Sequence, residues 1–200
     1  MRSPALPFLL APLCLGLYGV IRILDGLDGS RGPGLAWTAG HLVFLVGLGF
    51  FALAFRTMWT MAGRTGLATA GFVAGIAGEL AVGVQFGIDL VAGFRSADRG
   101  GMDAFFARIQ DVPGVDAAFY SYGPLLFFAG QLALVTLLAV GRRVKPWAPV
   151  LVLAEVVLPL LDKNFIPLGA ALLLVAFAPL LRRGAVPRST SDPVAPLIGG

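Results

Sequence analysis

Long apolar runs alternate with short charged or glycine- and proline-rich segments along this chain. A helix needs about 20 mostly apolar residues to cross the hydrocarbon core of a membrane. The pattern therefore predicts an all-α, polytopic transmembrane helix bundle with six spans, at about 5–24, 37–55, 66–92, 118–140, 147–162 and 164–181. The last two are short and only Lys163 separates them. As an alternative they form a tight hairpin that does not fully cross, so five or six spans remain possible.

The segments outside the spans are of two kinds. Residues 1–183 form the bundle domain, and the segment 184–200 is small, polar and proline-containing, so we expect a disordered cytoplasmic tail there. The longest loop, 93–117, carries four apolar side chains at helical spacing, Met102, Phe105, Phe106 and Ile109. This spacing predicts a short amphipathic helix that lies on the outer membrane surface or covers the bundle.

The overall composition supports the membrane interpretation. Of the 200 residues 58% are hydrophobic and 13% are charged, and the mean hydropathy is +0.87. A soluble domain of this length could not hide so much apolar surface. The net charge of +4 would suggest nucleic acid as the partner of a soluble protein, but here the basic residues flank apolar runs. We therefore expect membrane lipids, and no nucleic acid, as partners.

The basic residues also predict an orientation. With six spans, the N-terminus, the loops 56–65 and 141–146 and the tail share one side, which carries nine of the 15 lysine and arginine residues. By the positive-inside rule both termini are cytoplasmic and the loop 93–117 is external. Arginine greatly outnumbers lysine, as in GC-rich bacterial genomes. We expect a multi-pass protein of the bacterial cytoplasmic membrane.

One acidic residue lies at the centre of the third span, within a row of residues four apart: Gly71, Gly75, Glu79, Gly83 and Gly87. Four-residue spacing places them along one stripe of a helix, and glycines on a stripe let a second helix come close. An acid on this stripe cannot face lipid cheaply. Glu79 is therefore expected in a protein interior, and the four glycines form a candidate face for a partner helix.

The polar residues within or next to the spans, including those of the third span, fall at two depths. Glu79, Gln131 and Glu155 lie near the middle of their spans, whereas several others lie toward the outer ends: His41, Gln85, Asp89, Tyr120, Tyr122, Asp162 and Asn164. If these side chains converge, the bundle holds a polar cavity that opens outward and closes on the carboxyl groups of Glu79 and Glu155. A structural alternative is that Glu79 is a protonated carboxyl group bonded to Gln131 or Glu155.

Three functions fit this arrangement. The leading hypothesis is binding or transport of a small cationic or amphiphilic molecule, with Glu79 as the charge-pairing or proton-exchanging group. The first alternative is a membrane-embedded enzyme on a lipid or isoprenoid, a terpene-cyclase-like cyclase or isomerase with Glu79 or Glu155 as general acid. The second is a non-catalytic subunit that packs a partner helix. No cofactor motif, histidine cluster or aspartate-rich motif is present, so neither a cofactor nor a metal is expected.

Three short segments carry a family resemblance: His41 to Gly47, Gln85 to Asp89 and Tyr122 to Phe127. They resemble small uncharacterised membrane proteins of high-GC actinobacteria. The resemblance implies a six-helix bundle and no particular activity.

Overall fold

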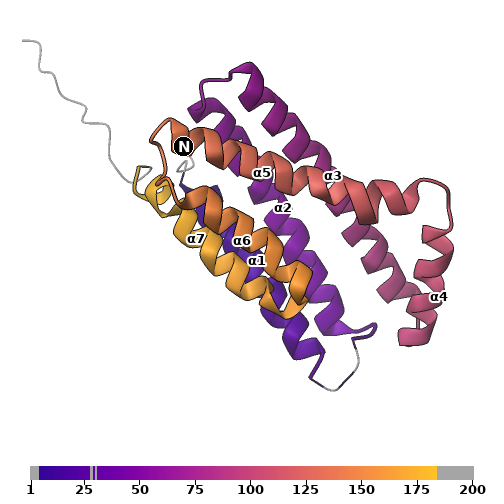
Figure 1. The fold of residues 1–200 in the computed structure, drawn as a ribbon. Helices are drawn as coiled ribbons and strands as arrows, with labels where there is room; N and C mark the ends of the chain where they lie inside the picture. The colour runs from indigo at the N-terminus through magenta and orange to yellow at the C-terminus, as the bar shows by residue number, and fades with distance from the viewer. Residues whose placement is uncertain (1–4, 28, 30, 184–200) are drawn as a thin grey trace, which may run out of the picture.

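The computed structural model describes residues 5–27, 29 and 31–183, and the predicted tail 184–200 lies outside them. The described residues form seven α-helices and no strand, which confirms the all-α class (Figure 1). The helices are α1 (Leu6–Asp25), α2 (Leu35–Met61), α3 (Gly66–Arg95), α4 (Arg99–Gln110), α5 (Tyr122–Val140), α6 (Ala148–Leu161) and α7 (Ile166–Arg183). A π-helical turn (Asp116–Ser121) precedes α5, and a 3-10 turn (Lys163–Phe165) joins α6 to α7.

Six of the helices form a closed ring in which each packs against two neighbours. The order around the ring is α1, α2, α3, α5, α6 and α7, and α7 packs back onto α1. Inside the ring most side chains are apolar, and many of them are aromatic. Phe8 of α1 meets Phe177 of α7 edge to face, and Phe127 of α5 does the same with Phe51 of α2. Such contacts hold the two halves of the ring together.

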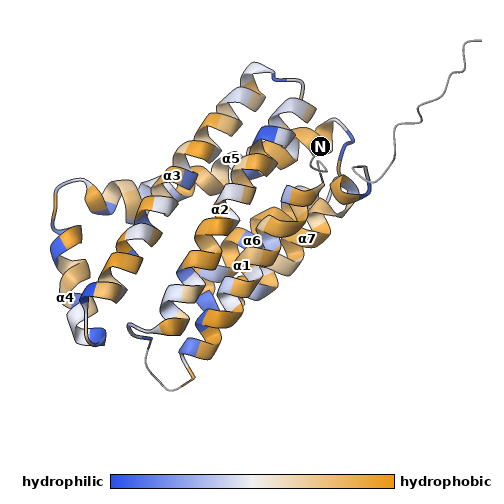
Figure 2. Cartoon of the chain, turned by 180° about the vertical axis from the view of Figure 1, so that it is seen from behind, coloured by the Kyte–Doolittle hydropathy of each residue, from blue (hydrophilic) through white to orange (hydrophobic). Residues whose placement is uncertain are grey.

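Five segments are long and apolar enough to cross a membrane: Leu6–Asp25, Leu35–Met61, Gly66–Arg95, Asp116–Val140 and Lys163–Arg182. In the apolar 18-residue window of each segment only 28% to 39% of the residues are buried, and many large apolar side chains of these helices are exposed. Figure 2 shows the same distribution, with hydrophobic colour along most of the helices and hydrophilic colour mainly near their ends. Such a surface suits lipid rather than water.

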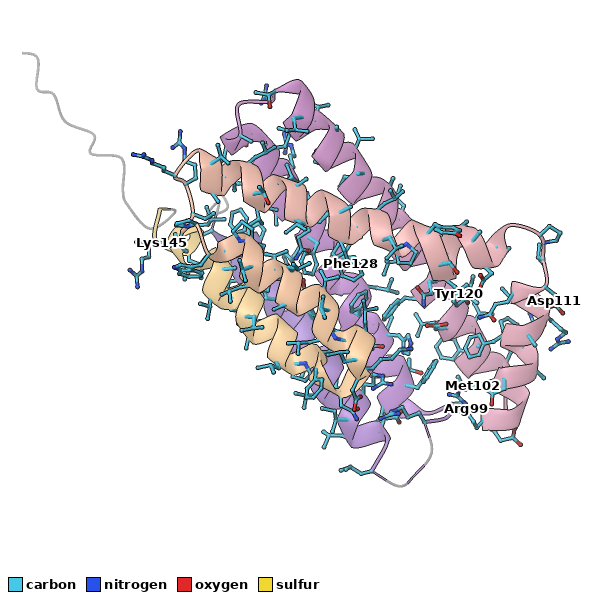
Figure 3. The ribbon with its side chains drawn as sticks, viewed as in Figure 1. Arg99, Met102, Asp111, Tyr120, Phe128 and Lys145 are labelled. Carbon is cyan, nitrogen blue, oxygen red and sulfur yellow. The ribbon has the colours of Figure 1, made fainter. Side chains whose placement is uncertain are left out.

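The helix α6 has only 14 residues and is not among these five. It nevertheless runs between the two ends of the bundle. It begins just after Lys145, which Figure 3 shows at the opposite end from Arg99. The turn that follows it contains Asn164, which bonds Arg22 near the end of α1. The hairpin of α6 and α7 therefore reaches the end of the bundle that carries α4, here named the α4 end.

The second helix is longer than predicted. Residues 56–65 were expected as a loop, but α2 continues to Met61. The reason is that Met58 extends the apolar face by one turn and is fully buried, while Arg56 points to the exposed side. Thr60 is also exposed and donates its hydroxyl to the carbonyl of Thr57. A charged residue on the outer face does not stop a helix whose inner face still packs.

Glycines bring α3 and α5 into close contact. A Cβ atom at Gly78 would overlap the backbone of Phe127, and one at Gly130 would overlap the backbone of Gly75. Gly71 also faces α5, beside Ala133. The predicted glycine stripe is therefore used in part within this chain. At Gly87 a Cβ atom would meet nothing within 4 Å.

The short helix predicted in 93–117 is present as α4, at the end of the bundle where Figure 3 labels Arg99 and Met102. Asp98 caps it by accepting a hydrogen bond from the backbone N–H of Gly101 at 2.8 Å. Met102 is fully buried, and Phe105, Phe106 and Ile109 are half-buried. The apolar face of α4 thus rests on the bundle, and its polar face is exposed.

Candidate ligand cavity

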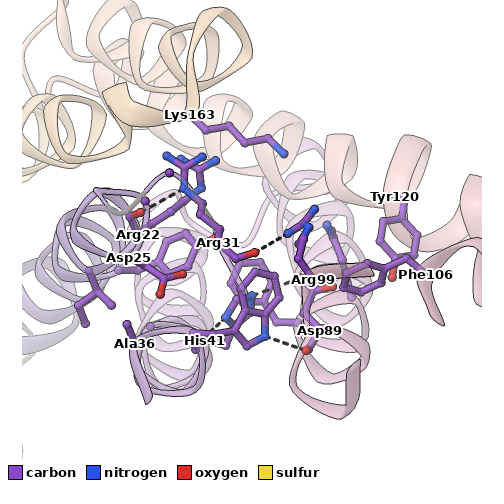
Figure 4. Close-up of a pocket in the computed structure, with 18 of the residues that line it drawn as sticks. Arg22, Asp25, Arg31, Ala36, His41, Asp89, Arg99, Phe106, Tyr120 and Lys163 are labelled. Carbon is purple, nitrogen blue, oxygen red and sulfur yellow. Dashed lines mark hydrogen bonds and ion pairs between the residues drawn. The ribbon is translucent and has the colours of Figure 1, made fainter. Parts of the chain in front are cut away.

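A cavity of about 590 Å³ opens at the α4 end, where α1 and α3 finish and α2 begins (Figure 4). This volume is typical of sites for small molecules. Helix α4, the π-helical turn and the turn after α6 complete its wall. Its polar and aromatic lining comprises Tyr18, Arg22, Asp25, Arg31, Trp37, His41, Gln85, Phe86, Asp89, Arg99, Phe106, Gln110, Tyr120 and Lys163. We call it the ligand cavity.

Helical spacing explains how the lining is assembled. Three helices each contribute two residues four positions apart: Tyr18 and Arg22 from α1, Trp37 and His41 from α2, and Gln85 and Asp89 from α3. Residues four apart lie on the same face of a helix. The three pairs meet because α1 and α3 end, and α2 begins, at the same end of the bundle.

His41 is held on both ring nitrogens. Its Nδ1 atom lies 2.7 Å from the carbonyl oxygen of Trp37, and its Nε2 atom lies 3.4 Å from Oδ2 of Asp89. A carbonyl oxygen can only accept, so Nδ1 carries a hydrogen. Trp37 in turn donates its indole N–H to the backbone carbonyl of Asp89 at 2.9 Å. Two hydrogen bonds and the close Nε2–Oδ2 contact thus link Trp37 and His41 of α2 to Asp89 of α3.

Aromatic rings form the floor of the ligand cavity. Tyr18 and Phe86 line the cavity and meet edge to face. Phe44 lies outside the lining, stacks on Phe86 with ring centres 3.9 Å apart and also contacts Tyr18 edge to face. His41 lies 4.2 Å from the Trp37 ring and 5.0 Å from the Phe86 ring, measured between ring centres. Such rings offer a flat apolar surface to a ligand that enters from the polar rim.

The rim is positively charged. Four basic side chains, Arg22, Arg31, Arg99 and Lys163, face the acids Asp25 and Asp89. The acid Asp89 contacts His41. The base Arg99 forms an ion pair at 3.0 Å with Asp103, a residue outside the cavity lining. The rim therefore has an excess of cationic groups.

Tyr120 lies in the π-helical turn at the start of the fourth predicted span. Pro124 lacks the N–H that would bond the carbonyl of Tyr120, and the N–H of Tyr122 bonds the carbonyl of Ala117, one residue further back than in an α-helix. Such π-helical turns often lie at functional sites. The hydroxyl of Tyr120 is buried and has no partner in the described structure. The residue lines the ligand cavity, but its hydroxyl oxygen is shielded behind the cavity surface.

Of the ten polar residues named for the predicted cavity, four line the ligand cavity: His41, Gln85, Asp89 and Tyr120. Asp162 and Asn164 are outside the lining, although Asn164 accepts a hydrogen bond from Arg22 at the rim. The other four are outside the lining as well. Tyr122 is 72% exposed on the outside of α5, and the remaining three, Glu79, Gln131 and Glu155, are buried elsewhere in the bundle. The structure therefore differs from the single funnel that was expected to close on Glu79 and Glu155. The physical reason is the aromatic floor, because Phe86 lies on α3 about two turns from Glu79.

Glu79 lies between α3 and α2. Its carboxyl group reaches the backbone of Ala52, and its Oε2 atom is buried with no partner in the described structure. The expected bonds to Gln131 or Glu155 are not formed. The position of Glu79 on its helix explains this, because the neighbouring Gly78 rather than Glu79 faces α5.

Gln131 and Glu155 form a separate buried pair. The amide Nε2 of Gln131 donates to Oε2 of Glu155 at 3.0 Å, and this bond joins α5 to α6. Gln131 is fully buried and Glu155 is 4% exposed. On the other side of Glu155, Gly169 lets α7 come close, since a Cβ atom there would lie 3.3 Å from Cγ of Glu155. The pair is enclosed by protein on three helices.

Sequence reasoning missed several residues of the cavity, namely Tyr18, Arg22, Arg31, Trp37, Arg99 and Lys163. The basic ones were interpreted only as topology signals. A signal was present in the chain: polar or aromatic pairs four apart recur at the same end of three successive spans. Among the described residues, no three His, Cys, Asp or Glu side chains gather to hold a metal ion.

No protein-family model, no curated protein and no solved structure matches this chain. A functional interpretation therefore starts from the geometry of the cavity.

Proposed function

We propose that this chain is a multi-pass protein of the bacterial cytoplasmic membrane that binds a small amphiphilic molecule in the ligand cavity. In this proposal six helices cross the membrane, both termini are cytoplasmic and the α4 end is external. The apolar outer surface of the helices supports the membrane placement, and the distribution of basic residues supports the orientation.

One observation carries the proposal: the ligand cavity combines a charged rim with an aromatic floor. The rim contains Arg22, Arg31 and Lys163, and the floor contains Tyr18 and Phe86. An amphiphile has the same division into a polar and an apolar part. Polar side chains of the lining, such as Gln85 and Gln110, add directional hydrogen-bonding groups, as ligand sites commonly have.

The geometry favours binding over acid catalysis. A cyclase needs its general acid within hydrogen-bonding reach of the substrate. Neither Glu79 nor Glu155 lines the ligand cavity, and along α3 the cavity-lining Phe86 lies between Glu79 and Asp89. For the same reason we place ligand recognition at the rim rather than at Glu79.

Tryptophan fluorescence offers a direct test. The chain has three tryptophans, and the substitutions Trp59→Phe and Trp147→Phe leave only Trp37, which lines the cavity. In phosphatidylcholine nanodiscs this protein is titrated with three probes brominated at the chain end: bromoundecanoate, bromoundecanol and bromoundecyltrimethylammonium. We expect saturable quenching of Trp37 by at least one of them.

Matched substitutions separate the cavity from the bilayer. Ala36 lines the cavity, whereas the adjacent Leu35 is 87% exposed. Ala36→Phe should weaken the saturable quenching about tenfold by filling space that the ligand needs, and Leu35→Phe should leave it unchanged. A protein that keeps only Trp147 reports quenching from the lipid phase. Non-saturable quenching of equal strength at Trp37 and Trp147 would disprove the proposal.

A further inference from the structure

Two arginine side chains at the rim share one neutral hydrogen-bond acceptor. Nη1 of Arg22 and Nη2 of Arg31 each lie 3.2 Å from Oδ1 of Asn164. Nε of Arg31 donates to the backbone carbonyl of Arg22, also at 3.2 Å. A guanidinium carries five N–H donors in a planar fork that matches carboxylate and phosphate groups. The bonds described here engage only some of these donors and end on neutral oxygens.

The arrangement brings two positive charges together at one point. Asn164 supplies a dipole there, but it supplies no negative charge to balance them. The turn fixes this acceptor, because the backbone N–H of Asn164 donates to Oδ1 of Asp162 at 2.8 Å. Gly26 makes room for Arg31, since a Cβ atom at Gly26 would lie 2.8 Å from Nη2 of Arg31. The convergence is therefore built into three separate segments of the chain.

A third cation lies beside the pair. Lys163 precedes Asn164 in the same turn, and Figure 4 shows its side chain extending over the cavity near Arg31. Two acids near Arg22 offset part of the charge, Asp162 next to the same turn and Asp25 of the lining, and Asp89 is engaged with His41. Three cations then face two acids at this part of the rim. The remaining field at this part of the rim attracts anions.

We propose that the ligand carries a carboxylate or phosphate group that binds between the guanidinium groups of Arg22 and Arg31, with Lys163 beside it. This inference rests on the proposed function and specifies the class of ligand. The apolar part of the molecule then lies against Tyr18, Phe86 and Trp37, which face the same space. Of the cationic and amphiphilic ligands expected from the sequence, the rim favours an amphiphile with an anionic end.

The three brominated probes test the charge preference, since they differ only in the head group. Bromoundecanoate should bind at least about tenfold more tightly than bromoundecyltrimethylammonium, as expected for hydrogen bonds between charged partners. If the alcohol or the ammonium probe binds as tightly and Ala36→Phe still blocks it, the anion site is disproved while the cavity stands. Absence of saturable binding by every probe would disprove both.

Substitutions locate the site. Arg22→Gln and Arg31→Gln should each weaken bromoundecanoate binding about tenfold, because each removes a charged donor. Arg95→Gln is the control, since Arg95 is exposed at the same end of the bundle and lies outside the lining. Lys163 is exposed, so Lys163→Gln is expected to fold normally. It should weaken binding about threefold through lost charge alone. Unchanged affinity in Arg22→Gln and Lys163→Gln would overturn the inference.

The lipid composition identifies the source of the anion. Nanodiscs of phosphatidylcholine are compared with nanodiscs in which about a third of the lipid is phosphatidylglycerol. Competition between this lipid and bromoundecanoate supports the site with a lipid head group as its occupant. An unchanged affinity supports the site with a free amphiphilic acid as its occupant.

Discussion

At the scale of single residues, the best-defined chemistry belongs to His41. The carbonyl of Trp37 at Nδ1 and the carboxyl group of Asp89 at Nε2 give its two nitrogens different partners. Since a carbonyl can only accept, the hydrogen on Nδ1 is present whatever the state of Nε2. The ring is also enclosed by Trp37, Tyr18 and Phe86. Its orientation is therefore fixed by contacts on every side.

We predict that Nδ1 of His41 stays protonated in the folded protein. The chain contains one histidine, so nitrogen NMR of protein labelled at histidine reports this ring without assignment. A neutral ring should show its hydrogen on Nδ1. A spectrum with the hydrogen on Nε2 alone would contradict the bond to Trp37, and the bond to Asp89 would then become the dominant one.

The Gln131–Glu155 pair gives a second prediction at this scale. Removal of one partner leaves a buried polar group unpaired, so Gln131→Leu and Glu155→Leu should each lower the free energy of unfolding by about 1–3 kcal/mol. The double substitution should cost less than the sum of the two, because neither group is then left alone. Thermal and denaturant unfolding in detergent measure these values. Strict additivity would show that the pair does not interact.

At the scale of helices, much could be predicted because apolar runs themselves specify membrane-length helices. The segments α1 and α3 differ from the predicted 5–24 and 66–92 by only a few residues at their ends. The contacts between helices were harder to predict. A glycine row four apart indicated Gly71, Gly75, Gly83 and Gly87, whereas the contact with α5 uses Gly71, Gly75 and Gly78. Two helices that cross share only a short region of contact, and its position depends on both of them.

The same limit applies to the cavity. The polar residues His41, Gln85, Asp89 and Tyr120 could be predicted because polar groups near the ends of spans must face water or protein. Arg22 could not, since a basic residue near the end of a span is equally expected as a topology signal. Only the packing of the turn that contains Asn164 against α1 assigns it to the rim.

The α3–α5 crossing leads to the third prediction. Gly78→Ala and Gly130→Ala should each destabilise the protein by about 1–3 kcal/mol or more, because the added methyl group overlaps backbone that cannot move aside easily. Gly87→Ala is the matched control within α3. It should be neutral or stabilising by up to about 1 kcal/mol, since alanine favours a helix. Equal thermal stability of all three variants would mean that α3 and α5 are not in close contact.

At the scale of the whole molecule, the main question is which segments share a side of the membrane. The hairpin of α6 and α7 brings Lys163 to the α4 end, while Arg64 and Arg143 lie in turns at the ends of α2 and α5 that are remote from it. If six helices cross, Lys163 is on the same side as α4. If α6 does not cross, so that only five spans remain, Lys163 is on the same side as Arg64 and Arg143.

Cysteine labelling of intact cells tests this arrangement. In a Cys14→Ala background, single cysteines replace four exposed residues: Arg64, Ala107, Arg143 and Lys163. An impermeant maleimide should label positions 107 and 163 in intact cells, and positions 64 and 143 only after the membrane is permeabilised. Protection of position 163 together with 64 and 143 would indicate five spans. Labelling of position 64 in intact cells would reverse the proposed orientation.

The shortness of α6 has a consequence for the surrounding bilayer. Its 14 residues extend about 21 Å at 1.5 Å per residue, against a hydrocarbon core of about 30 Å. In the proposed placement this hydrophobic mismatch should thin the bilayer beside α6, and the polar turn at Lys163 and Asn164 should draw water and head groups into a dimple on the outer side. The rim of the ligand cavity then lies at the edge of the dimple. An amphiphile already dissolved in the outer leaflet would reach Arg22 and Arg31 sideways, without leaving the membrane.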